Sequence, residues 1–118
     1  MSAETGKETI FGKMIKGEMP CIKVYEDETL LVIKDIHPVA PIHFLIIPKK
    51  AIVDLQSIQE EDMGIMQDVV RIAQKLAKEY KLDDGYRLVT NCGPGAGQTV
   101  LHLHFHFMGG RKLTHGLG

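Results

Sequence analysis

Residues 101–107 read Leu-His-Leu-His-Phe-His-Phe, so apolar and imidazole side chains alternate without interruption. Successive side chains of a strand point to opposite faces, whereas a helix would scatter three such rings around its axis. The period of two therefore predicts a strand over residues 98–108. One face would carry imidazoles about 6.6 Å apart, from His102, His104 and His106. The opposite face would enter the core with Leu101, Leu103, Phe105 and Phe107.

Three interpretations of this row of histidines are open. It could be the polar, solvent-facing side of a half-buried strand, although such faces normally mix several polar residue types. It could be part of a zinc site, because a His-x-His pair on a strand can ligate one metal, with Cys92 and His43 as further ligands brought in by the fold. It could also be catalytic, because a neutral imidazole attacks electrophiles and its neighbours donate hydrogen bonds to phosphate oxygens.

The remainder of the chain predicts helices and strands in mixed order. Thr9 is placed to cap a short helix ended by Gly17 and Pro20. Ser57 and Glu60 have the spacing of a capping box before a long helix over residues 58–80. Its apolar stripe would comprise Met63, Met66, Val69, Val70, Ala73, Leu76, Ala77 and Tyr80. Further strands are expected at residues 24–25, 30–36, 43–47 and 86–90.

Short turns between these strands indicate an antiparallel α+β layer. The chain of 118 residues is enough for one core, so we expect a single domain over residues 1–118. Within it, residues 1–8 would form a loose N-terminus and residues 109–118 a C-terminal tail. No internal repeat or low-complexity block divides the sequence.

Composition narrows the possible partners. A formal net charge of −1 gives no basic field for a polyanion, so nucleic acid is not an expected partner. The longest apolar runs are too short to cross a bilayer, and the first ten residues lack a hydrophobic signal segment. Two widely separated cysteines are few for a secreted small protein. A cytoplasmic protein without a membrane partner is therefore expected.

Residues 102–108 fit the pattern His-φ-His-φ-His-φ-φ, where φ is apolar, at all seven positions. The sequence therefore resembles the histidine triad family. Residues 9–13, 35–48, 97–100 and 109–111, together with Asn91, resemble its nucleotide-binding branch. The resemblance implies an antiparallel five-stranded sheet with one long and one short helix, and a homodimer whose two sheets join into one.

The same resemblance implies a phosphoramidase that splits the P–N bond of purine nucleoside 5′-phosphoramidates. His104 would attack phosphorus, forming a nucleotidyl-histidine that water hydrolyses to a nucleoside 5′-monophosphate. His106 would donate to a phosphate oxygen, while His102 and His43 would orient the site. The Thr99 hydroxyl would serve the leaving group or the phosphate. No cofactor or metal would be required. Alternatives are a dinucleoside polyphosphate hydrolase of the fragile-histidine-triad type and a nucleotide-sensing or scaffold module with incidental catalysis.

The family's binding residues for an AMP- or GMP-like nucleotide map onto matching positions. Asp35 would accept hydrogen bonds from the ribose hydroxyls, although alone it is typical of a turn. The phosphate side would involve Asn91, Gly97, Gln98 and Thr99, within a glycine-rich loop that alone is equally typical of a hairpin. The purine would lie against Ile10, Phe11, Met14, Ile33 and Ile36. His37 and His115 match no role and are expected on the surface.

Overall fold

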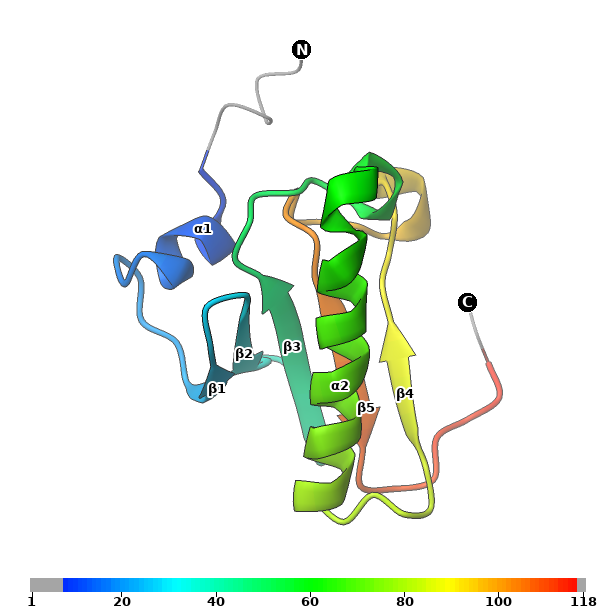
Figure 1. The fold of residues 1–118 in the computed structure, drawn as a ribbon. Coiled ribbons are helices and arrows are strands. Elements are labelled where there is room, and N and C mark those ends of the chain that lie inside the picture. Colours follow the sequence, from blue (N-terminus) through cyan, green and yellow to red (C-terminus); the bar gives the residue numbers. More distant parts are fainter. Residues whose placement is uncertain (1–7, 117–118) are drawn as a thin grey trace.

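A computed structural model describes residues 8–116 of the chain. One antiparallel sheet has the strand order β1-β2-β3-β5-β4, which places β1 and β4 at its edges (Figure 1). This arrangement confirms the α+β prediction and the five strands. Their bounds are β1 Lys23–Glu26, β2 Leu30–Lys34, β3 Ile42–Pro48, β4 Tyr86–Val89 and β5 Phe105–Gly109.

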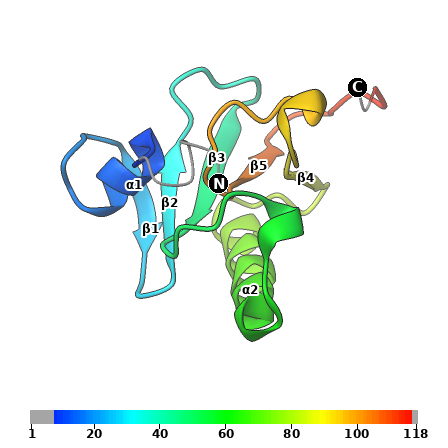
Figure 2. The same cartoon turned by 90° about the horizontal axis from the view of Figure 1, so that it is seen from above.

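Two α-helices lie against this sheet. The short helix α1, Ile10–Ile15, packs near the β1–β2 end, whereas the long helix α2, Met63–Glu79, covers the opposite face (Figure 2). Thr9 caps α1 as predicted, because its Oγ1 accepts a hydrogen bond from the Gly12 N–H at 3.1 Å. Short 3₁₀ helices occupy Leu55–Ser57, Glu60–Asp62 and Pro94–Ala96.

Both faces of the central strands are buried. The α2 side holds the larger core, which includes alternate residues of β2 and β3 such as Val32 and Ile46. The α1 side holds a smaller cluster of Phe11, Leu31, Ile33, Leu45 and Ile47. Burial on both faces explains why these two strands read as continuous apolar runs rather than as alternating ones.

The long helix begins later than predicted. It starts at Met63 rather than at residue 58, and no capping box forms between Ser57 and Glu60. Asp54 caps the preceding turn instead: its Oδ1 accepts from the Ser57 N–H at 2.9 Å and from the Ser57 hydroxyl at 2.8 Å. Ser57 thereby ends one 3₁₀ turn rather than starting the helix.

The predicted apolar stripe of this helix is only partly correct. Val69, Ala73 and Leu76 are buried, together with Ile72, which the prediction omitted. Met63, Val70 and Tyr80 are exposed. The helix therefore turns a narrower face toward the sheet than the broad stripe indicated.

The predicted histidine strand is shorter than its alternating pattern. It begins at Phe105, runs to Gly109 and leaves residues 98–104 irregular. Pairing with β3 ends at Ile46↔Phe105, and Pro48 has no N–H with which to extend the ladder. The Leu103 N–H instead donates to the Ile52 carbonyl, at 2.6 Å.

Other boundaries move by one or two residues. Strand β2 ends at Lys34 rather than at residue 36, because Asp35 Oδ1 accepts the His37 N–H in a turn, at 2.8 Å. Residues 1–7 of the predicted loose N-terminus and residues 117–118 of the predicted C-terminal tail lie outside the described residues. Within residues 8–116, no helix has the length and apolar character needed to cross a membrane.

Candidate active site

The three histidines of the alternating pattern lie on the α1 side of the sheet. His106 is on β5, opposite Leu45 of β3, and His102 and His104 immediately precede that strand. The His104 ring centroid is 5.4 Å from that of His106 and 4.8 Å from that of Phe11. Leu103, Phe105 and Phe107 enter the α2-side core as predicted, whereas Leu101 is only half-buried.

These rings are not a solvent-facing polar surface. His102 is 3% exposed and His104 is 9% exposed, while His106 is partly open to solvent. The Phe11 ring meets both buried imidazoles edge-on, with its centroid 6.3 Å from that of His102. Buried imidazoles need hydrogen-bond partners, and those partners fix the ring tautomers.

The partner of His104 determines which of its nitrogens is free. Its Nδ1 lies 2.8 Å from the carbonyl oxygen of His102. Because a carbonyl oxygen only accepts hydrogen bonds, Nδ1 carries the proton and donates. The Nε2 atom of neutral His104 therefore has an unshared electron pair, as a nucleophile requires.

His102 also binds a backbone carbonyl, but through Nε2 rather than through Nδ1 as His104 does. Its Nε2 lies 2.7 Å from the Pro48 carbonyl oxygen, so Nε2 carries the proton and donates. This bond ties the segment before β5 to the end of β3. Thr90 adds a second tie, because its hydroxyl donates to the His104 carbonyl oxygen at 2.7 Å.

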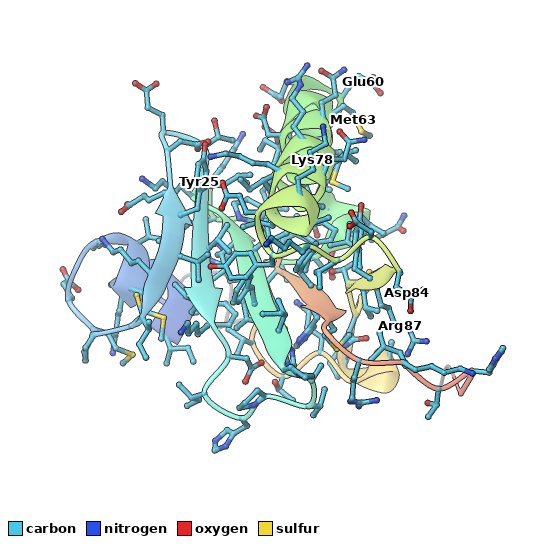
Figure 3. The ribbon with its side chains drawn as sticks, turned by 90° about the horizontal axis from the view of Figure 1, so that it is seen from below. Tyr25, Glu60, Met63, Lys78, Asp84 and Arg87 are labelled. Atoms are coloured by element: carbon cyan, nitrogen blue, oxygen red, sulfur yellow. The ribbon has the colours of Figure 1, made fainter. Side chains whose placement is uncertain are left out.

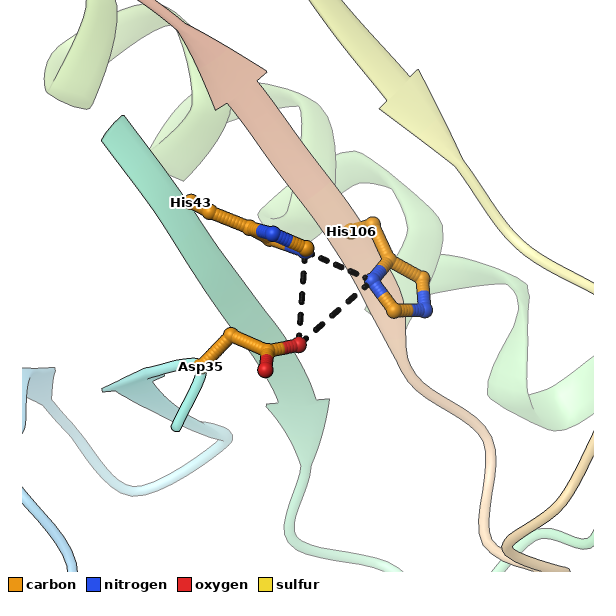
Figure 4. Close-up of side chains that lie close together, drawn as sticks. All are labelled: Asp35, His43 and His106. Carbon is orange, nitrogen blue, oxygen red and sulfur yellow. Dashed lines mark hydrogen bonds and ion pairs between the residues drawn. The ribbon is translucent and has the colours of Figure 1, made fainter. Parts of the chain in front are cut away.

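His43, on the adjacent strand β3, and Asp35, in the turn after β2, both approach His106 (Figure 4). His43 Nε2 lies 2.9 Å from His106 Nδ1 and 3.3 Å from Asp35 Oδ2. Asp35 Oδ2 is 4.0 Å from His106 Nδ1. The three side chains come from β3, β5 and the turn after β2, so the sheet register brings them together.

A backbone N–H determines which atoms of this cluster donate hydrogen bonds and which accept them. The Val39 N–H donates to His43 Nδ1 at 3.1 Å, so neutral His43 carries its proton on Nε2. That proton is directed at His106 Nδ1, which must then accept. Neutral His106 consequently carries its own proton on Nε2, where it is available as a hydrogen-bond donor.

Burial keeps all four rings neutral near pH 7. It is the largest influence on each of them and lowers the pKa of His43, His102, His104 and His106 below 6.5. The Asp35 carboxylate opposes this effect, because it raises the pKa of His43, His104 and His106.

Asp35, His43 and His106 are also close enough to be considered as metal ligands. Among the described residues their ligand atoms form one group within 4.8 Å of one another, which does not include Cys92. A metal on His43 Nε2 would move the ring proton to Nδ1, where it would face the Val39 N–H. The hydrogen bonding therefore fits a proton-bearing His43 better than a metal-bound one.

The glycine-rich loop is held by the Gln98 side chain, which is buried. Its Oε1 accepts from the Gly93 N–H at 2.8 Å, and its Nε2 donates to the carbonyl oxygens of Val53 and Val100 at 2.7 and 3.0 Å. Both amide protons are thus used within the protein. Gln98 braces the loop, and direct donation from its side chain to a phosphate would break one of these bonds.

Other predicted nucleotide-binding residues are distributed unevenly. Gly97 has a φ of 93°, and a side chain there would lie 3.9 Å from Asn91 Nδ2, so these two residues are neighbours. Phe11, Met14 and Ile33 share the α1-side cluster, whereas Ile10 and Ile36 are exposed and outside it. Thr99, His37 and His115 are also exposed, as expected for the last two.

Sequence reasoning missed several groups that orient the histidines. The carbonyls of His102 and Pro48 and the N–H of Val39 belong to the backbone, so residue type gives no signal for them. The sequence also gave no indication that Thr90 binds the backbone at His104.

A separate cavity of about 690 Å³ is lined by residues from 81–87 and 110–113, none of them a predicted site residue.

Comparisons with known proteins agree with this fold. The chain is 47% identical over 105 residues to a protein of Chlamydia muridarum described as an uncharacterized HIT-like protein, covering 89% of this chain and 83% of that protein. It is similar to a solved HIT family hydrolase from Clostridium thermocellum, with 45% identity, a TM-score of 0.89, and coverage of 94% of this chain and 97% of that chain.

A histidine triad nucleotide-binding protein from Candida albicans is a more distant match, with 32% identity, a TM-score of 0.76, and coverage of 93% of this chain and 86% of that chain. The family model described as "HIT domain" matches residues 16–113. These residues include every strand as well as Asp35, His43 and the three histidines of the alternating pattern. The five-stranded sheet, the row of imidazoles and this match lead to one conclusion: the chain belongs to the HIT domain family.

Proposed function

We propose that this protein is a purine nucleoside phosphoramidase that works through a nucleotidyl-histidine intermediate on His104. The observation that carries the proposal is the 2.8 Å contact between His104 Nδ1 and the His102 carbonyl oxygen. It leaves Nε2 unprotonated, and burial keeps the ring neutral by lowering its pKa. The names of two similar structures, a hydrolase and a nucleotide-binding protein, add support.

The first step forms a bond between His104 Nε2 and phosphorus and breaks the P–N bond of the substrate. The departing amine takes one proton from solvent, delivered through the Thr99 hydroxyl. His104 becomes a cationic phosphoryl-imidazolium whose Nδ1–H remains bonded to the His102 carbonyl. Fixing the attacking nitrogen beside the phosphate replaces an encounter with solvent water by an oriented reaction.

In the second step water attacks phosphorus, the Nε2–P bond breaks and one proton returns to solvent. The products are a nucleoside 5′-monophosphate and neutral His104. His106 Nε2–H donates to a phosphate oxygen in both steps, because His43 keeps the Nδ1 atom of His106 as an acceptor. Hydrogen bonds from histidine rings would therefore stabilise the negative charge on the phosphate. We propose that no metal or other cofactor is needed.

The nucleoside would bind beside these rings. Asp35 has an oxygen within 4.0 Å of both His43 and His106, so ribose hydroxyls on this carboxylate would lie next to the phosphate donors. The purine would lie toward the α1-side cluster around Phe11 and Ile33. The glycine-rich loop braced by Gln98 would approach the phosphate from the other side.

A homodimer and a cytoplasmic location are parts of the proposal. Strand β4 is an edge strand with exposed Tyr86 and Leu88, at 39% and 37%, and α2 also exposes Met63, labelled in Figure 3. Pairing of two such edges would join the sheets and cover these apolar side chains. The two free cysteines suit a reducing compartment.

The test is a comparison of kcat/KM for adenosine 5′-phosphoramidate, an aminoacyl adenylate and a dinucleoside polyphosphate. We expect the phosphoramidate and the aminoacyl adenylate to have a higher kcat/KM than the dinucleoside polyphosphate. The reverse order would favour a dinucleoside polyphosphate hydrolase. Tight AMP binding with negligible turnover of all three would instead favour a sensing module.

A further inference from the structure

The C-terminal segment that leaves β5 returns to the loop before β3. Arg111 Nη2 donates to the Val39 carbonyl oxygen at 2.8 Å, across 72 positions of the sequence. Its other terminal nitrogen, Nη1, donates to the Lys112 carbonyl oxygen at 2.9 Å. The guanidinium thus connects the segment after β5 to Val39, the residue whose N–H donates to His43.

Gly110 gives this contact a second, independent basis. Its φ is 94°, and a Cβ atom there would lie 3.0 Å from Pro41 Cβ and 3.5 Å from Ile42 N. The segment therefore lies directly against the loop before β3. Because Gly109 pairs with Ile42 in the sheet, this close approach continues from the β3–β5 ladder.

Hydrogen bonds on the two sides of the Val39 Cα then link the surface to the candidate active site. Arg111 donates to the Val39 carbonyl, the Val39 N–H donates to His43 Nδ1, and His43 Nε2–H donates to His106 Nδ1. The Arg111 guanidinium and the Val39 N–H can only donate hydrogen bonds. The tautomers of the two imidazoles follow from the position of the Val39 donor.

We propose that Arg111 is a positioning residue for His106, acting through Val39 and His43. By binding the Val39 carbonyl it restrains the backbone at Val39, whose N–H lies on the other side of the same Cα, so that His43 keeps its proton on Nε2 and His106 keeps its own on the Nε2 atom that would face the substrate. The inference rests on the proposed function of His106 as a phosphate donor. Arg111 itself contacts none of the reacting atoms.

Without Arg111 the Val39 carbonyl loses a side-chain donor, so the backbone at Val39, including its N–H, is held less firmly. His43 Nδ1 then loses a fixed donor, and both ring tautomers become accessible to His43. In the Nδ1–H tautomer, His43 Nε2 accepts, so His106 would carry its proton on Nδ1 and lose its outward donor. The expected defect is therefore in kcat more than in KM.

The experiment compares Arg111→Met and Arg111→Lys with the matched control Arg87→Met. Arg87 also binds the same C-terminal segment, because its Nη2 donates to the Thr114 carbonyl oxygen at 2.6 Å, and it lies beside that segment in Figure 3. Its hydrogen bond is to Thr114 rather than to Val39. Two quantities are measured in the full chain: kcat and KM for adenosine 5′-phosphoramidate, and the ¹⁵N shifts of the histidine ring nitrogens.

We expect Arg111→Met to lower kcat about 10-fold or more while KM changes little, since small misplacements of catalytic groups cost that much. The His43 nitrogen shifts should move from a pure Nε2–H pattern toward the average of two tautomers. Arg111→Lys should recover part of kcat, and Arg87→Met should match the parent. Unchanged His43 shifts in Arg111→Met, or an equal loss of kcat in Arg87→Met, would overturn the inference.

The ring-nitrogen measurement also separates this inference from the proposed function. If the parent protein lacks turnover, the phosphoramidase proposal fails, but the His43 shift difference between the parent and Arg111→Met still tests the positioning role. If the parent turns over and the shifts do not respond to Arg111→Met, only the positioning role is lost.

Discussion

The Nδ1 atom of His104 donates to the carbonyl oxygen of His102, two residues earlier in the chain, at 2.8 Å. The contact is local, and the residues that form it lie outside regular strand geometry, because β5 begins at Phe105. A fully regular strand would have committed that carbonyl to a ladder hydrogen bond or to solvent. The irregular segment thereby orients the nucleophilic nitrogen of His104.

The pH dependence of catalysis should reveal the neutral histidines. Because burial lowers the pKa of His104, kcat/KM should be flat around pH 7 and fall only below pH 6.5, as protonation removes the electron pair on Nε2. Asp35→Asn should move this acidic limb to lower pH, since the carboxylate raises the pKa of His43, His104 and His106. The exposed Asp83→Asn is the control. A limb that stays in place in Asp35→Asn would contradict the coupling.

Stability should decline in the same pH range. The pKa values of His43, His102, His104 and the partly open His106 are lowered in the folded protein, so the unfolded chain binds protons first as pH falls through 6.5. The free energy of unfolding should therefore decrease below pH 6.5 and level off once the folded rings are also protonated. Urea unfolding at several pH values measures this. A free energy of unfolding that stays constant as pH falls below 6.5 would contradict the lowered pKa values of these four rings.

Gln98→Leu should destabilise the protein through the glycine-rich loop. It removes the partner of the Gly93 N–H and of two carbonyls, those of Val53 and Val100. A buried polar group without a partner costs about 1–3 kcal/mol, so a loss of about 2 kcal/mol or more is expected in urea unfolding. Gln59→Leu, at an exposed glutamine, should change the free energy of unfolding by less than about 0.5 kcal/mol. Equal effects would show that Gln98 does not brace the loop.

Much of the fold could be predicted because its signals are local. The apolar runs of β2 and β3 and the Thr9 cap each depend on neighbouring residues only. The start of α2 could not be predicted from Ser57 and Glu60, because Asp54 has an equivalent spacing to Ser57 and captures its N–H. Two competing caps of similar strength need tertiary packing to decide between them.

The sequence was enough to predict which residues form the candidate site, but not which ring nitrogen of each histidine carries the proton. The row of histidines and the motif around Asp35 and His43 indicated which side chains to consider. Their tautomers depend on the His102 and Pro48 carbonyls and the Val39 N–H, which are available at any residue type. The same limitation concealed the role of Gln98, whose partners lie up to 45 positions away.

The proposed dimer can be tested at the β4 edge. Sedimentation should give twice the monomer mass, and Leu88→Lys should shift the equilibrium to monomers, because it places a charge where two edges would meet. Ile22→Lys is the matched control, since Ile22 is also exposed but lies before the opposite edge strand β1. A monomeric parent, or dissociation by both variants alike, would contradict a β4–β4 interface.

The most direct test of the central claim is to trap the covalent intermediate. The protein is mixed with excess adenosine 5′-phosphoramidate, quenched during turnover at a pH that preserves phosphoramidate bonds, and digested for mass spectrometry. We predict one nucleoside monophosphate on the peptide containing His104, and its absence in His104→Ala, whose turnover should fall by about three orders of magnitude or more. His115→Ala, which removes an exposed ring, should give the same adduct as the parent. An adduct on another histidine, or undiminished turnover in His104→Ala, would contradict His104 as the nucleophile.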